Sequence, residues 1–264
     1  MQVSTALDPA LLRKTVTKFA VRRWIGEPYV GKRMKLRHLR RLLRDIDLPP
    51  NPRLLEVGSG DGVFTHWLSR RFQDAEVDGV ELDPAESAAC AAWAQRCGQT
   101  RLHFRQGNVL DMKEQGVYDL IICLDVLEHI ADDQAAVARM MAALKPGGWL
   151  VVHVPNLWYQ RLGGSMHTCP PDEAWQINPG HVRNGYTPEQ LGQLLQSASA
   201  EHVESHPRHG RWSDLAHSVY RWLERPAFLR LLAVPLVDTI WMLDRLMPSA
   251  HCNTVFGIAR KPSA

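Results

Sequence analysis

Three glycines in a short turn are the first residues whose spacing indicates ligand binding. Gly58, Gly60 and Gly62 follow an apolar run, Arg53 to Val57, and precede a helical pattern that starts near Val63. Glycine permits the sharp bend and the close approach of backbone to ligand that such a strand-to-helix turn requires. By itself the turn fits a dinucleotide, another cofactor or no ligand.

A carboxylate follows at the end of the next apolar run. Glu81 ends a predicted strand from Val77, about 20 residues after the glycine turn, at the place where dinucleotide folds carry their acid. A carboxylate there accepts hydrogen bonds from both hydroxyls of a ribose. Because dinucleotide-binding enzymes use the same geometry, a nicotinamide-dependent oxidoreductase stays open at this point.

Three further motifs follow in the chain, at residues 106–111, 124–130 and 144–150. Together with the glycine turn and Glu81 they resemble, in order, the motifs of class I S-adenosylmethionine-dependent methyltransferases, and they are similar to those of the bacterial ubiquinone-biosynthesis O-methyltransferases. The resemblance covers about residues 50–200 and implies S-adenosylmethionine as the cofactor. The family places an Asp where Asn108 stands, and Asn also offers an acceptor. The residues that the resemblance assigns to cofactor binding are Glu56, Gly58, Ser59, Gly60, Gly62, Glu81, Leu82, Asn108, Val109 and Leu124.

Short apolar runs alternate with helical patterns along most of the chain, which predicts an α/β fold with a parallel sheet and helices on both faces. The resemblance implies a Rossmann-like, doubly wound, seven-stranded sheet with an antiparallel last strand. Residues 156–180 form a long irregular stretch that we interpret as a lid loop. After it, Thr187 and Gln190 form a capping box that starts a helix. The predicted strands lie near residues 53–57, 77–81, 102–106, 118–123, 149–154, 202–205 and 254–259.

The candidate catalytic residues follow the fourth strand and the lid. Asp125, Glu128 and His129 are spaced to share one helical face above the carboxyl ends of the strands. Methyl transfer is an in-line displacement, so the enzyme aligns the acceptor and deprotonates it where its pKa is high. His181 precedes the capped helix and suits the second task. We predict Asp125, His129 and His181 as the catalytic residues.

Two carboxylates and one imidazole also suit a divalent ion. The same Leu-Glu-His pattern occurs in methyltransferases that need no metal, so we assign no metal ligand.

Two flanking segments lie outside the motifs. Residues 1–50 form a basic amphipathic helical extension, with twelve basic residues between Arg13 and Arg44. Residues 51–264 form the methyltransferase domain, which carries an apolar insertion at 207–252. Peripheral membrane contact through 32–44 and 226–247 is one interpretation, and a homodimer surface or packing within the protein is the other. No nucleic-acid partner is expected, because the arginines lie on a helix whose opposite face is apolar.

Composition agrees with these expectations. The chain of 264 residues has 45% hydrophobic residues and five cysteines without a C-x-x-C pair, which fits a reducing compartment. We expect a cytoplasmic protein, with the inner face of the membrane as an added location. The predicted activity is methyl transfer to an oxygen, less readily a nitrogen, of a small-molecule or lipid-linked acceptor. A catalytically silent scaffold subunit at a membrane and a nicotinamide-dependent oxidoreductase are the alternatives.

Overall fold

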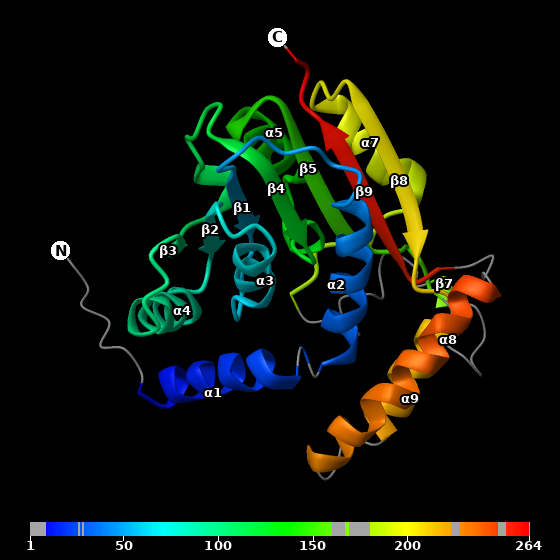
Figure 1. Cartoon of the computed structure of the whole chain (residues 1–264). Coiled ribbons are helices and arrows are strands. Elements are labelled where there is room, and N and C mark those ends of the chain that lie inside the picture. The colour runs from blue at the N-terminus through cyan, green and yellow to red at the C-terminus, as the bar shows by residue number, and fades with distance from the viewer. Residues whose placement is uncertain are drawn as a thin grey trace.

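A seven-stranded sheet organises the molecule (Figure 1). The computed structural model describes residues 9–25, 27, 29–159, 167–168, 180–222, 227–247 and 252–263. The strand order is β3-β2-β1-β4-β5-β9-β8, and β9 is antiparallel to both of its neighbours while β1 to β5 are parallel. This confirms the predicted doubly wound sheet with an antiparallel last strand. The strands are β1 (Arg53–Val57), β2 (Glu76–Glu81), β3 (Leu102–Gln106), β4 (Tyr118–Leu124), β5 (Leu144–Pro155), β8 (His202–Arg208) and β9 (Thr254–Arg260).

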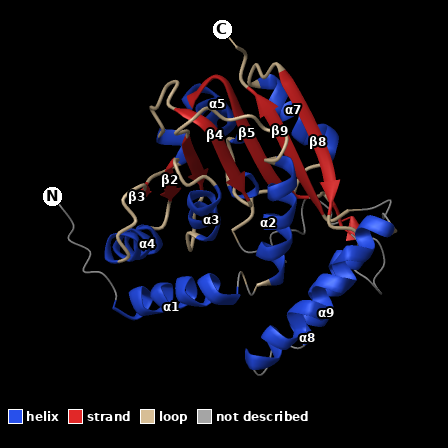
Figure 2. Cartoon of the chain, in the orientation of Figure 1, coloured by secondary structure: helices blue, strands red, loops and turns tan. Residues whose placement is uncertain are grey.

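Helices cover both faces of the sheet (Figure 2). All seven residues of β4 are buried, as expected for a parallel strand with both faces covered. Its side chains alternate, so that Ile121 lies in one core cluster while Leu120 and Ile122 lie in the other. One cluster includes helices α5 (Asp133–Ala143) and α7 (Pro188–Ser197), and the other includes α3 (Val63–Arg71) and α4 (Pro84–Arg96).

The strand order reverses between β1 and β4, which are neighbours in the sheet although two strands separate them in sequence. In open α/β sheets, ligands bind outside the carboxyl ends of the strands at such a switch point. The glycine turn after β1 and the segment after β4 therefore meet at one edge. This topology is what positions the site.

The predicted capping box is confirmed at the start of α7. The Thr187 hydroxyl accepts from the Gln190 backbone N–H at 3.2 Å, and the Gln190 side chain accepts from the Thr187 N–H at 2.9 Å. The segment before it contains two short paired strands, β6 (Trp158–Tyr159) and β7 (His167–Thr168). The rest of the predicted lid loop, 160–166 and 169–179, lies outside the described residues.

The predicted basic amphipathic helix is α2 (Val30–Leu42), preceded by α1 (Pro9–Ile25). The apolar face of α2 is buried within the protein. Leu36 and Leu39 pack in the cluster that includes Leu120 of β4, and Met34 packs with residues of the apolar insertion. Helix α1 packs against α4.

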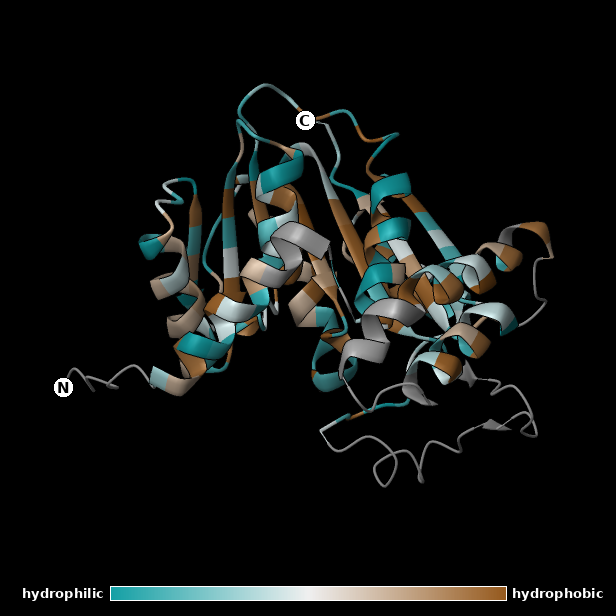
Figure 3. Cartoon of the chain, turned by 60° about the horizontal axis from the view of Figure 1, so that its bottom comes forward, coloured by the Kyte–Doolittle hydropathy of each residue, from teal (hydrophilic) through white to brown (hydrophobic). Residues whose placement is uncertain are grey.

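The insertion forms two helices, α8 (Arg211–Trp222) and α9 (Ala227–Leu246), which pack against each other (Figure 1). Helix α9 buries Val237 and Trp241, whereas Leu236, Met242 and Leu246 are exposed. In Figure 3 the helices alternate hydrophobic and hydrophilic residues, as helices that bury one side do. Within the described ranges, no helix has both the length and the apolarity that a membrane span requires.

An ion-pair cluster joins α2 to α9. Asp238 accepts from Arg33 at 3.1 and 2.8 Å and also pairs with Arg37, whose guanidinium lies over the Trp241 ring. These side chains are about a quarter exposed, so water screens the pairs only in part.

Replacing Asp238 with Ala should loosen α9 from α2, because both arginines lose their carboxylate. Hydrogen bonds to charged groups contribute about 1.5–3 kcal/mol each, so amide hydrogen exchange in α9 should quicken at least tenfold while α5 stays unchanged. Asp74→Ala, at a surface carboxylate, is the matched control. Unchanged exchange in α9 would show that apolar packing alone holds the insertion.

Candidate active site

The glycine turn is held tightly between β2 and the segment after β4. The Gly58 and Ser59 N–H groups donate to the Val80 carbonyl at 2.8 and 3.0 Å. Gly58 has a φ of 74°, and a Cβ there would lie 2.3 Å from Cγ2 of Val126. Only glycine fits both the backbone angle and the space.

The turn is open where a ligand would bind. A Cβ built on Gly60 meets nothing within 4 Å, and its N–H donates to Glu81 Oε2 at 2.7 Å. The other Glu81 oxygen accepts from the Asp83 N–H at 3.0 Å. Each carboxylate oxygen has a second lone pair, which remains for a ribose hydroxyl. Leu82, beside it, is 65% exposed and offers an apolar surface to a base.

Two buried polar side chains lie behind the turn. Glu56 is 1% exposed and accepts a hydrogen bond from the Thr65 hydroxyl, and burial raises its pKa to about 8. The Ser59 hydroxyl is buried without a hydrogen-bond partner among the described residues. Unpartnered buried hydroxyls are rare in folded proteins, so this one fits a site that a polar ligand completes. The residues present therefore suit the expected cofactor.

The remaining predicted cofactor residues line the same edge. Asn108 caps a short 3-10 helix, η1 (Val109–Asp111), and its side-chain oxygen accepts from the Leu110 N–H at 3.0 Å. Val109 and Leu124 are buried at 5% and 6% exposure. One acceptor lone pair of Asn108 is thus engaged in the cap, and the amide oxygen has a second lone pair that a ligand could use.

The structure corrects the shared helical face expected for Asp125, Glu128 and His129, whereas the catalytic role of Asp125 stays a prediction. Asp125 has a φ of 56°, and only a single 3-10 turn, η2 (Leu127–His129), follows it. The helical spacing that would align Asp125 with His129 is therefore absent. Asp125 instead accepts from His153 Nδ1 at 2.6 Å and forms an ion pair with Lys35 of α2.

Lys35 and His153 are site residues that the sequence analysis missed. Burial lowers the pKa of Lys35 to about 8. His153 is 1% exposed, and burial, followed by the Lys35 charge, holds its pKa well below the usual range. His153 is therefore neutral, and its Nδ1 donates to Asp125, while Nε2 has no hydrogen-bond partner in the part of the chain that the structure describes. A histidine inside the apolar run of β5 was the available signal.

Glu128, His129 and His181 come together on the other side of the same edge. The His129 and His181 rings meet edge to face with centroids 4.5 Å apart, and each of the three residues offers a ligand atom within 4.8 Å of the others. Glu128 is 1% exposed, and burial raises its pKa. One of its carboxylate oxygens has no hydrogen-bond partner among the described residues. Burial and the neighbouring His129 lower the pKa of His181. Such a group can transfer a proton or hold a divalent ion.

The tautomer of His129 follows from its partner. His129 Nδ1 lies 2.8 Å from the Gly180 carbonyl oxygen. A carbonyl only accepts, so Nδ1 carries the proton and Nε2 of the neutral ring is an acceptor.

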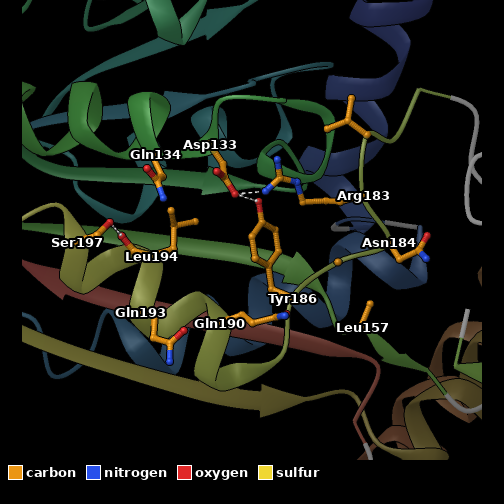
Figure 4. A pocket seen from close by; sticks show the side chains of 12 residues that line it. Asp133, Gln134, Leu157, Arg183, Asn184, Tyr186, Gln190, Gln193, Leu194 and Ser197 are labelled. Atoms are coloured by element: carbon orange, nitrogen blue, oxygen red, sulfur yellow. Dashed lines mark hydrogen bonds and ion pairs between the residues drawn. The ribbon is translucent and has the colours of Figure 1, made fainter. Parts of the chain in front are cut away.

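A polar cavity of about 730 Å³ lies between α5, the segment 182–186 and α7. Figure 4 shows Arg183 and Tyr186 directed at Asp133 of α5, and the Tyr186 hydroxyl donates to Asp133 at 2.8 Å. Arg183 also donates to the Ile130 carbonyl at 2.9 Å. These contacts tie the segment that carries His181 to the segment after β4.

Comparison with known proteins agrees with this geometry. The fold and the site define the class of S-adenosylmethionine-dependent methyltransferases. A family model described as a methyltransferase domain matches residues 29–205, and the chain belongs to this family. The match begins within the predicted N-terminal extension and includes α2.

Named relatives support the same class. The chain is 27% identical over 184 residues to a ubiquinone biosynthesis O-methyltransferase from Methylobacterium sp. (strain 4-46), covering 66% of this chain and 73% of that one. It is 28% identical over 106 residues to the enzyme of that name from Leptothrix cholodnii, covering 39% of this chain but only 44% of the relative. A Haemonchus contortus phosphoethanolamine N-methyltransferase 2 shares the fold, with a TM-score of 0.65 at 19% identity over 94% of this chain and 58% of that one.

The stability of the cofactor-free protein should depend on Glu56. Its pKa is raised from 4.5 to about 8, so between these values the folded state keeps a proton that the unfolded chain releases. The free energy of unfolding should therefore fall with rising pH in this window, by up to about 1.4 kcal/mol per pH unit. Urea denaturation should show that the free energy of unfolding of Glu56→Gln depends less on pH than that of the wild type. Glu201→Gln, at an exposed carboxyl, should keep the pH dependence of the wild type. Equal slopes in wild type and Glu56→Gln would contradict a buried, protonated Glu56.

Proposed function

We propose that this methyltransferase acts on a hydroxyl oxygen, less readily on a nitrogen, of a small-molecule or lipid-linked acceptor. The observation that carries the proposal is the acceptor tautomer of His129, held by the Gly180 carbonyl beside His181. The proposed role of the pair is to take the hydroxyl proton as the methyl group is transferred.

The chemistry of the acceptor favours oxygen. A neutral amine is nucleophilic without a base, whereas an alcohol or phenol with a high pKa gains from a proton acceptor in the transition state. Glu128 lies beside His129, and ligand atoms of the two side chains lie within 4.8 Å of each other.

Asp125 takes a different part in this proposal. Because Lys35 and His153 engage its two oxygens, we assign it to positioning α2 over the carboxyl end of β4. The nicotinamide and scaffold alternatives are set aside by the family and by the fit of the glycine turn to its cofactor.

Replacing His129 with Ala should lower kcat on hydroxyl acceptors by about 10²- to 10⁴-fold, the usual contribution of a general base. Methyl-labelled S-adenosylmethionine and a panel of phenols, alcohols and amines provide the assay, and His202→Ala, at an exposed histidine of β8, is the control. The affinity for S-adenosylhomocysteine should stay unchanged. Turnover of amines alone, unaffected by His129→Ala, would overturn the proposal.

The same three ligand atoms favour a second candidate, a divalent ion at Glu128, His129 and His181. The assay distinguishes the two. Activity that EDTA abolishes and Mg²⁺ or Mn²⁺ restores would assign the cluster to a metal, and activity indifferent to EDTA would assign it to proton transfer.

A lipid-linked acceptor would be reached through the exposed face of α9. Leu236, Met242 and Leu246 are 51%, 52% and 75% exposed and follow one side of the helix. We propose that segment 226–247 contacts the membrane surface there. Residues 32–44 contribute less, since their apolar side is buried and Arg33 and Arg37 pair with Asp238.

Flotation with vesicles of phosphatidylserine and phosphatidylcholine should bring the protein to the top of a gradient at low salt. Met242→Asp combined with Leu246→Asp should abolish flotation, because charges on the lipid-facing side oppose burial. Val16→Asp, on α1, is the control. If the wild-type protein stays at the bottom of the gradient, segment 226–247 does not contact the membrane surface. The exposed face of α9 would then be assigned to contact with a second copy of the chain.

A further inference from the structure

Two lysines from the N-terminal helices meet at one carboxylate of the glycine turn. Asp61 stands between Gly60 and Gly62. Lys32 of α2 lies 2.6 Å from one Asp61 oxygen, and Lys18 of α1 lies 3.3 Å from the other. The side chains of the lysines are 30% and 28% exposed. Two positive charges thus converge on the Asp61 carboxylate at the rim of the cofactor turn.

The lysines are held in place by buried contacts of their own helices. Phe19, next to Lys18, is 2% exposed and stacks on Trp93 with ring centroids 3.6 Å apart. Its ring tip would lie 3.1 Å from a Cβ at Gly62. Val30 and Met34, on either side of Lys32, are buried against the apolar insertion. These contacts fix the backbone that carries the two lysines, so less of the chain has to be ordered when a ligand binds.

The glycine turn beside the lysines offers a polar group and open space to a ligand. The Ser59 hydroxyl is buried, 4% exposed as a residue, and has no partner among the described residues. The space beside Gly60 is open. The Glu56 carboxyl behind the turn is largely protonated at neutral pH, so it does not neutralise the lysines.

A ligand with a carboxylate matches this set. The methionyl end of S-adenosylmethionine carries one, and charge-assisted hydrogen bonds from lysine are among the stronger contacts for it. We infer that Lys18 and Lys32 bind the carboxylate of the methyl donor, so that α1 and α2 form part of the cofactor site. This inference rests on the cofactor and is independent of the acceptor.

The experiment compares two ligands that differ in the methionyl end. S-adenosylhomocysteine has the carboxylate, whereas 5′-methylthioadenosine keeps the adenosine and the sulfur but lacks the amino-acid part. Isothermal titration of Lys32→Met and of Lys18→Met should show the Kd for S-adenosylhomocysteine raised about tenfold or more. The Kd for 5′-methylthioadenosine should change less than twofold. Lys32→Arg, which keeps the charge, should retain most of the affinity for S-adenosylhomocysteine.

Lys14→Met, at an exposed position of α1, is the matched control and should bind both ligands as the wild type does. An equal loss of both ligands in Lys32→Met would mean a damaged turn and would overturn the inference, as would an unchanged Kd for S-adenosylhomocysteine in both variants. Failure of the wild type to bind S-adenosylhomocysteine would instead count against the cofactor assignment itself.

Discussion

The contact between the turn after β1 and the segment after β4 is the constraint on which the site depends. β1 and β4 pair directly, so their carboxyl ends emerge side by side. Gly58 has no room for a Cβ because Val126 fills that space. The cofactor turn and the acceptor residues are thereby packed against each other, and a change on either side shifts both. One side of this junction is carried by β4, all of whose residues are buried.

Charge pairing over long sequence distances arranges the elements around that junction. Lys18 and Lys32 meet Asp61, Lys35 meets Asp125, and Arg33 and Arg37 meet Asp238. Part of the positive charge of the N-terminal helices thus forms ion pairs within the protein. A half-buried ion pair is costly to break when only one partner is removed, so these pairs specify where α1 and α2 lie.

The acceptor side is assembled from two segments that only the fold unites. His129 follows β4, and His181 follows the lid, yet their rings touch. The contacts of Arg183 and Tyr186 with Asp133 join these two segments. Among the residues that the structure describes, one carboxylate oxygen of Glu128 on this side has no hydrogen-bond partner, and our proposal places the acceptor chemistry here.

The sequence by itself determined where the strands lie, the order of the motifs that follow them, the glycine turn and the capping box at Thr187. Each of these features depends on local periodicity or on the backbone of a few neighbouring residues. Only the tertiary structure decided that Asp125 turns to Lys35 and His153, since a single residue with positive φ ends the expected helical spacing. It also decided that the basic helix packs inward. Partners that lie 90 or 205 residues apart in the chain leave no local signal.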